Sequence, residues 1–191
     1  MSPEATAPSD DARVAARRRI HLGVAEQGKL HALRGEHPLA LQHYREAMNQ
    51  AVRFGEPEVF YRHYLECALE SLELMGALDE VVAWCDAALE HYRAHPPQTA
   101  VGARDLAHIH QRRGIALMKR GHRDPARAAL AEAIELQDGA MPLAATLLRW
   151  IDSRLHCDAA RITAEQRRQG FFSVRADTVD ARRAVPLSQV I

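Results

Sequence analysis

A spacing pattern that occurs three times limits what this 191-residue chain can fold into. The pattern is anchored by Gly35, Gly76 and Gly121, which lie 41 and 45 residues apart. Small or apolar residues follow each glycine at the fifth, ninth and twelfth positions: Ala40, Tyr44 and Ala47; Val81, Cys85 and Ala88; Ala126, Leu130 and Ala133. These offsets place the three residues on one face of an α-helix. The pattern therefore predicts three repeats, each with a helix that begins shortly after its glycine.

The glycine itself predicts where the preceding helix ends, because a helix C-terminus often needs a positive φ that glycine adopts at low cost. Seven residues earlier, in the middle of that preceding helix, lie Gly28, Leu69 and Gly114. A glycine inside a helix costs about 1 kcal/mol relative to alanine. Gly28 and Gly114 therefore indicate that two helices approach each other closely. Each repeat is predicted to be a helix, a short turn and a second helix.

Prolines and glycines between the repeats set the expected boundaries. A disordered lead-in is expected over residues 1–12 and a helical solenoid over 13–160. The solenoid divides into repeats at about 14–55, 58–95 and 99–138 and a capping helix at about 142–157, which carries Leu143, Leu147, Ile151 and Leu155 on one stripe. Residues 161–191 are expected to form a short helix and a tail. The stretch from Thr163 to Gln166 has the spacing of a capping box, so the short helix is expected to begin there.

The repeated positions resemble those of the tetratricopeptide repeat (TPR) family, whose pattern combines W-x2-L-G-x2-Y with A-x3-F and P. The first repeat offers Gly28, His31, Ala40 and Tyr44, and the stretch EHPLALQHYREAM comes closest to the family pattern. No repeat has the family's tryptophan, and the repeats are longer than the usual length of about 34 residues. The resemblance implies an all-α, TPR-type right-handed α-solenoid whose first helices line a concave groove. It also implies a module that binds a peptide or a helix in that groove and is not an enzyme.

Residues spaced three and four apart along each first helix share one face, and the resemblance implies that this face lines the groove. The expected groove residues are Leu22, Lys29, His63, Glu66, Glu70, Glu73, His108, Gln111, Ile115 and Met118. Glu66, Glu70 and Glu73 would make the middle of the groove acidic and favour a protein or peptide ligand with a basic segment. The alternative is a solvated face on which Lys29 or Arg62 pairs with the glutamates.

Eleven histidines and three cysteines raise the question of metal or catalytic sites. His91 and His95 have a metal-compatible spacing but no evident third ligand, so no metal site is expected. Cys85 occupies a repeat core position, and neither Cys67 nor Cys157 is expected to act as a nucleophile. The motifs HExxH, GxSxG and the P-loop are absent. The sequence therefore predicts no enzyme and no cofactor.

Net charge and hydropathy indicate which classes of partner to expect. The 25 basic residues balance the 25 acidic ones, which argues against a nucleic-acid partner. No apolar run is long enough to insert in a membrane. The number of cysteines is odd, so they do not form a disulfide framework, which fits a cytoplasmic protein.

The C-terminal tail combines positive charge with apolar residues. Residues 161–183 hold six arginines against three acidic residues, together with Phe171 and Phe172. Such a tail docks on its own domain, binds a partner, or lies in the acidic groove of the same or a neighbouring chain, which would allow self-association.

The sequence thus predicts a non-enzymatic interaction module, such as an adaptor, scaffold or chaperone. The alternatives are a regulatory TPR sensor that controls a transcription or signalling protein, and an accessory assembly factor for an enzyme complex.

Overall fold

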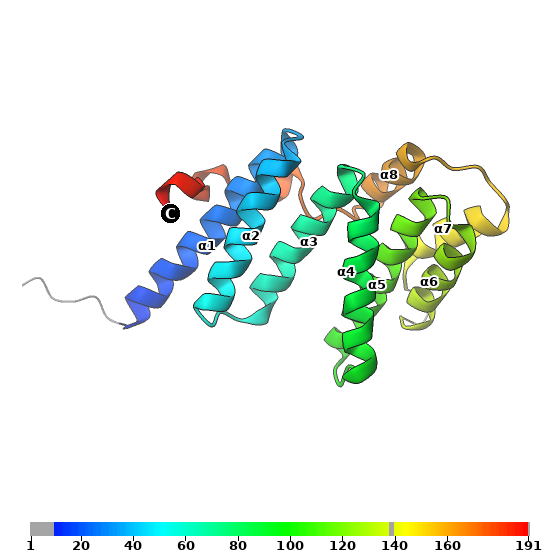
Figure 1. Cartoon of the computed structure of the whole chain (residues 1–191), viewed down its shortest axis with the longest axis horizontal. Helices are drawn as coiled ribbons and strands as arrows, with labels where there is room; N and C mark the ends of the chain where they lie inside the picture. The colour runs from blue at the N-terminus through cyan, green and yellow to red at the C-terminus, as the bar shows by residue number, and fades with distance from the viewer. Residues whose placement is uncertain (1–9, 138–139, 191) are drawn as a thin grey trace, which may run out of the picture. The chain divides into compact units, whose positions relative to one another are not determined.

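The computed structural model describes residues 10–137 and 140–190, and its regular structure is helical throughout these ranges (Figure 1). The helices are α1 (Asp10–Leu33), α2 (His37–Arg53), α3 (Glu58–Leu74), α4 (Leu78–Ala94), α5 (Ala100–Lys119), α6 (Arg123–Glu135), α7 (Pro142–Asp152) and α8 (Ala159–Arg168). Three single-turn 3₁₀ helices follow, η1 (Ala176–Thr178), η2 (Ala181–Arg183) and η3 (Leu187–Gln189).

The helix ends fall where the three glycines of the repeat predict them. Gly35, Gly76 and Gly121 follow α1, α3 and α5 with φ values of +76°, +81° and +81°. Each next residue donates its main-chain N–H back to a carbonyl five residues earlier, as Glu36 does to His31. This closure of the last turn needs the left-handed backbone that glycine supplies. The predicted role of these glycines is confirmed.

The close approach predicted from Gly28 and Gly114 is also confirmed. A Cβ on Gly28 would lie 2.7 Å from the Tyr44 ring, and a Cβ on Gly114 would lie 2.7 Å from Leu130 Cγ. Tyr44 and Leu130 occupy the same position of the repeat, nine residues after its glycine. The missing Cβ therefore makes room for the equivalent core side chain of the next helix in both repeats.

The chain divides into two compact units. Unit 1 consists of the described residues up to 71 together with 173–190, and unit 2 consists of residues 72–172. The core of unit 1 contains Val24 and Ala25 of α1, Ala47 and Ala51 of α2, and Tyr64 of α3. Consecutive helices α4 to α7 pack against one another in unit 2, and α8 adds to α5 and α7.

The predicted core positions of the repeat are mostly inaccessible to solvent. Ala40, Tyr44, Ala47, Val81, Cys85, Ala126, Leu130 and Ala133 are all buried, and Ala88 is half-buried. Burial of Cys85 confirms its interpretation as a small core residue.

Three expected boundaries need correction. The expected lead-in lies outside the described residues over 1–9, but residues 10–12 already belong to α1. The capping helix α7 ends at Asp152 rather than 157, and Arg154 follows with a left-handed φ of +52°. Helix α8 begins at Ala159, capped by the Asp158 carboxylate that accepts the Arg161 N–H, so Thr163 lies inside the helix.

Within the described residues, none of the helices combines the length and apolar character required to cross a membrane.

Candidate functional site

The expected groove residues divide between the two units. Leu22 and Lys29 of α1 and His63, Glu66 and Glu70 of α3 belong to unit 1. Glu73, at the end of α3, and the α5 residues His108, Gln111, Ile115 and Met118 belong to unit 2. The structure therefore gives two sets of neighbours, which are described separately.

In unit 1, the chain's own C-terminal segment, residues 173–190, lies beside α1 (Figure 1). The start of the segment contacts α3 through Glu70. Glu70 is only 3% exposed because this segment covers it. Its carboxylate accepts the main-chain N–H groups of Ser173, at 2.8 Å, and of Val174, at 3.2 Å. Glu70 is thus neither a solvated residue nor an open binding group in this structure.

Helix α1 holds the same segment at two further main-chain groups. Asp180 donates its N–H to the Glu26 carboxylate at 2.8 Å, and Val185 donates its N–H to the Gly23 carbonyl at 2.9 Å. Close contact at Gly23 depends on the missing side chain, since a Cβ there would lie 2.5 Å from Val185 Cγ2. We refer to the surface formed by Gly23, Glu26 and Glu70 as the α1–α3 face.

Apolar contacts complete the attachment of the C-terminal segment. Leu187 and Val190 pack against the unit 1 core, as Leu22 does. Within the segment, Asp177 pairs with Arg175 and Asp180 pairs with Arg183. In this structure the α1–α3 face thus contacts main-chain donors along an irregular segment, and the unit 1 core contacts aliphatic side chains near the end of that segment.

Lys29 and His63 lie beside this face in a mostly buried setting. Lys29 pairs with Glu26 at 2.8 Å, and the second oxygen of Glu26 holds the C-terminal segment. His63 Nε2 lies 3.9 Å from Cys67 Sγ. Burial lowers the pKa of His63 and raises the pKa of the Cys67 thiol to about 12. The thiol is therefore protonated at neutral pH and is a poor nucleophile.

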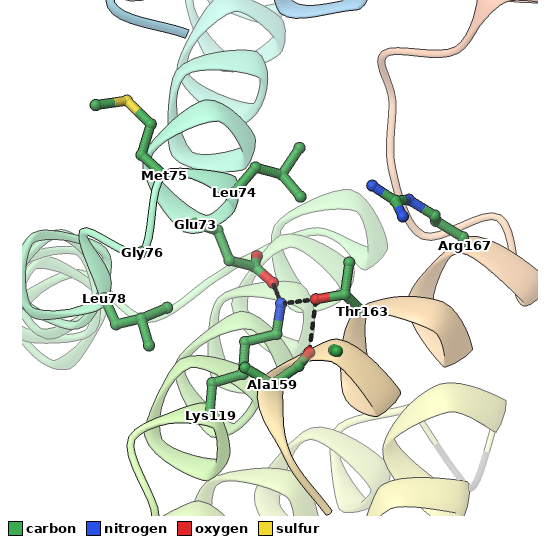
Figure 2. Close-up of a pocket in the computed structure, with 10 residues that line it drawn as sticks. Glu73, Leu74, Met75, Gly76, Leu78, Lys119, Ala159, Thr163 and Arg167 are labelled. Atoms are coloured by element: carbon green, nitrogen blue, oxygen red, sulfur yellow. Dashed lines mark hydrogen bonds and ion pairs between the residues drawn. The ribbon is translucent and has the colours of Figure 1, made fainter. Parts of the chain in front are cut away.

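In unit 2, Glu73 is the centre of a buried polar network. Figure 2 shows the part of it that includes Lys119 and Thr163. Its carboxylate accepts hydrogen bonds from Lys119 at 2.7 Å, from Arg112 at 3.2 Å and from the Gln166 amide at 2.7 Å. Lys119 also donates to Thr163 of α8 at 2.7 Å. Burial lowers the pKa of Lys119, whereas the Glu73 charge acts in the opposite direction. The network fixes the end of α3 to α5 and α8.

A cavity of about 420 Å³ lies next to this network. Its lining combines the Glu73–Lys119–Thr163 chain with apolar side chains and one exposed arginine: Leu74, Met75, Leu78, Ala159, Ala160 and Arg167 (Figure 2). Glu73 and Lys119 form an ion pair at the wall of this cavity. Both charges therefore interact with each other, and this interaction connects α3 to α5.

The expected groove residues on α5 differ in their exposure to solvent. Ile115 and Met118 are buried in the unit 2 core with Leu147 and Ile162, so they do not form surface contacts. Gln111 is buried, and its side-chain oxygen accepts the main-chain N–H of Ala144 in the first turn of α7. Their burial has a physical reason, since α7 and α8 cover that side of α5. His108 remains exposed, and Glu66 is half-buried.

Sequence reasoning missed Gly23 and Glu26, which hold the C-terminal segment. Gly23 could have been recognised from the sequence, because it lies inside a predicted helix like Gly28. A glycine there lowers helix stability relative to alanine, which indicates close contact with another segment. Glu26 could not have been recognised, since a charged residue on a helix surface is ordinary. Its partner is the main-chain N–H of Asp180, 154 residues away in the sequence.

The histidine pair expected to be non-metallic stacks ring on ring, with 4.8 Å between the centroids of His91 and His95. Among the described residues there is no group of three histidine, cysteine or acidic side chains placed to hold a metal ion.

No protein-family model, curated protein or solved structure matches this chain.

Proposed function

We propose that this chain is a TPR-like, non-enzymatic interaction module that binds an irregular segment of a partner protein on the α1–α3 face. One observation carries the proposal: the face already holds a chain segment, through main-chain N–H groups and two aliphatic side chains. Hydrogen bonds to the main chain of a bound segment provide affinity whatever its sequence, and apolar contacts with its side chains provide selectivity.

The assignment to TPR-like proteins is supported by the repeat. The three glycines end equivalent helices, and equivalent positions are buried after each of them. Terminal helices that cover the end of a stack are required in such architectures, and α7 and α8 bury Leu147 and Ile162 against the preceding helices.

The non-enzymatic assignment is supported by the state of the reactive side chains. The Cys67 thiol is held protonated by burial, and the neighbouring His63 has a lowered pKa. Glu73 and Lys119 form a buried ion pair that connects helices. These groups stabilise the fold and offer no activated nucleophile.

The test is affinity capture of the tagged full-length chain from its native cells, followed by reconstitution with the purified partner. Glu70→Gln is compared with Glu90→Gln, whose carboxylate lies on the exposed side of α4. Both substitutions are made in a chain that also carries Val185→Asp and Leu187→Asp, so that the chain's own segment competes less for Glu70. Hydrogen exchange with the partner bound should then slow on α1 and α3, and Glu70→Gln should weaken binding at least tenfold. A footprint on the exposed side of α2 or α4, or equal binding by both variants, would overturn the proposal.

A further inference from the structure

The C-terminal segment has the properties of a ligand that the chain carries for itself. It attaches at separate points on α1 and α3 rather than as part of a helix of the repeat. Its own turns are stabilised internally, since the Thr178 hydroxyl donates to the Ser173 carbonyl and its oxygen accepts the Arg175 N–H. A segment with such local order can leave and return as one piece.

From these contacts we infer that residues 173–190 block the α1–α3 face, and that a partner binds by replacing them with a segment of the same chemistry. This inference rests on the proposed function for the existence of a partner. The replacing segment has two successive free main-chain N–H groups for Glu70, so it has no proline there. About a dozen residues later it has aliphatic side chains in the places of Val185 and Leu187.

The Glu70 carboxylate is buried because the segment covers it, so departure of the segment exposes this carboxylate to water. Water then replaces the two main-chain N–H donors. A partner's main-chain N–H groups can take the same two places and cover the carboxylate again. The same holds for the Glu26 oxygen that accepts the Asp180 N–H.

Competition within one molecule is strong because the segment is tethered. A tethered segment need not be captured from solution, so it competes with an added segment at any protein concentration. Residues 173–190 occupy the face in this structure, and the apparent affinity for an added segment falls by the fraction of molecules that are open.

The experiment uses a fluorescent peptide with the sequence of residues 171–191 and measures its anisotropy with three full-length chains. The chains are wild type, the double variant Val185→Asp with Leu187→Asp, and the double variant Ser188→Asp with Gln189→Asp, whose positions are exposed. The first double variant keeps the α1–α3 face intact but weakens the segment's own attachment. We expect it to bind the peptide at least tenfold more tightly than the other two chains.

Equal binding of the peptide to all three chains would overturn the inference. So would unchanged binding when Glu70→Gln is added to the first double variant, because the peptide would then be lying elsewhere. If the Val185→Asp, Leu187→Asp variant fails to fold, an experiment on the wild type still tests the inference. Excess non-fluorescent peptide, made with heavy isotopes so that its fragments differ in mass from those of the chain, should speed hydrogen exchange in the chain's own residues 173–190. Unchanged exchange would refute the inference.

Light scattering distinguishes a second copy of the chain from a partner. We expect the wild type to be monomeric at micromolar concentration. A dimer that disappears in the Val185→Asp, Leu187→Asp variant would assign the face to the segment of a second copy and overturn replacement by a partner. Peptide binding without any captured partner would leave the blocking of the α1–α3 face by residues 173–190 standing, and would remove the proposed function together with replacement by a partner.

Discussion

At the scale of single residues, a missing methyl group sets the distance between α1 and α2. Gly28 faces the Tyr44 ring, which is fully buried and cannot rotate away without displacing its neighbours. Alanine favours helix formation over glycine, so intrinsic propensity and packing point in opposite directions at this position.

We expect packing to dominate in Gly28→Ala. The new Cβ would lie 2.7 Å from Tyr44 Cε1. Overpacking of this kind costs about 1–3 kcal/mol, which exceeds the gain of about 1 kcal/mol in helix propensity. The free energy of unfolding, from urea denaturation, should therefore fall. Ala83→Gly at an exposed position of α4 is the control, and its loss should be only about 1 kcal/mol. A stabilised Gly28→Ala would contradict the packing argument.

His21 makes unit 1 sensitive to acid. Its ring is fully buried, and Nδ1 forms a 2.7 Å hydrogen bond with the Tyr64 hydroxyl. Burial lowers its pKa from the ordinary value of 6.5, although Glu56 opposes that shift. The unfolded chain therefore binds more protons than the folded one between the lowered pKa and 6.5. Stability is complete above that window and is lost as the pH falls through it.

The measurement is the free energy of unfolding at pH 7.5 and pH 5.5 for wild type and for His21→Gln. Glutamine can still bond to Tyr64 but does not titrate in this range. The wild type should lose more stability between the two pH values than the variant does. Some loss should remain in the variant, because burial also lowers the pKa of His43 and His63. Equal losses would show that His21 does not contribute.

At the scale of helices, Glu73 in the last turn of α3 connects to α5 and α8 within unit 2. Its side chain has no solvent exposure, and the side chains of Lys119 and Arg112 are 3% and 5% exposed. Removal of one partner from such a buried pair leaves an uncompensated charge, which costs more than the pair itself contributes.

Glu73→Gln should therefore destabilise the protein by about 3–5 kcal/mol. Glu90→Gln is the matched control, because Glu90 pairs with Arg93 and its side chain is 72% exposed. The control should change the free energy of unfolding by less than about 1 kcal/mol. Similar effects of the two substitutions would mean that the Glu73 network carries little stability.

The start of α8 gives a prediction that separates two capping schemes. Asp158→Ala should cost about 0.5–2 kcal/mol, because it removes the acceptor for the Arg161 N–H. Asp158→Asn should be nearly neutral, since asparagine caps a helix equally well. Chemical denaturation of the two variants checks this. A neutral Asp158→Ala would restore the capping role that the sequence suggested for Thr163.

The same region shows what sequence spacing can and cannot predict. Helix ends at Gly35, Gly76 and Gly121 were predictable because local backbone geometry decides them. The spacing from Thr163 to Gln166 matched a capping box, but Gln166 instead donates to Glu73, 93 residues away. The pattern of Glu66, Glu70 and Glu73 predicted a shared helix face. It could not predict which distant donors cover the face, because periodicity carries no information about contacts between remote segments.

At the scale of the whole chain, residues near the end of the sequence depend on residues near its start. Gly23→Ala would place a Cβ 2.5 Å from Val185 Cγ2 and 2.6 Å from the Arg183 carbonyl oxygen. Because alanine favours the helix, α1 should stay intact while residues 173–190 exchange amide hydrogens faster. Hydrogen exchange read by mass spectrometry checks both outcomes, with Gln42→Ala on the exposed side of α2 as the control. Unchanged exchange in the C-terminal segment would show that the contact at Gly23 does not hold it.

The division of unit 1 between the two ends of the chain also affects how the protein is made. A ribosome makes α1, α2 and most of α3 first, then residues 72–172, and only afterwards the covering segment. At about 5–20 residues per second, several seconds separate the exposed face from its cover. Throughout that interval Glu70 lacks the two amides that later bind it. During each round of synthesis, a factor waiting near the ribosome would meet the face while it is still open.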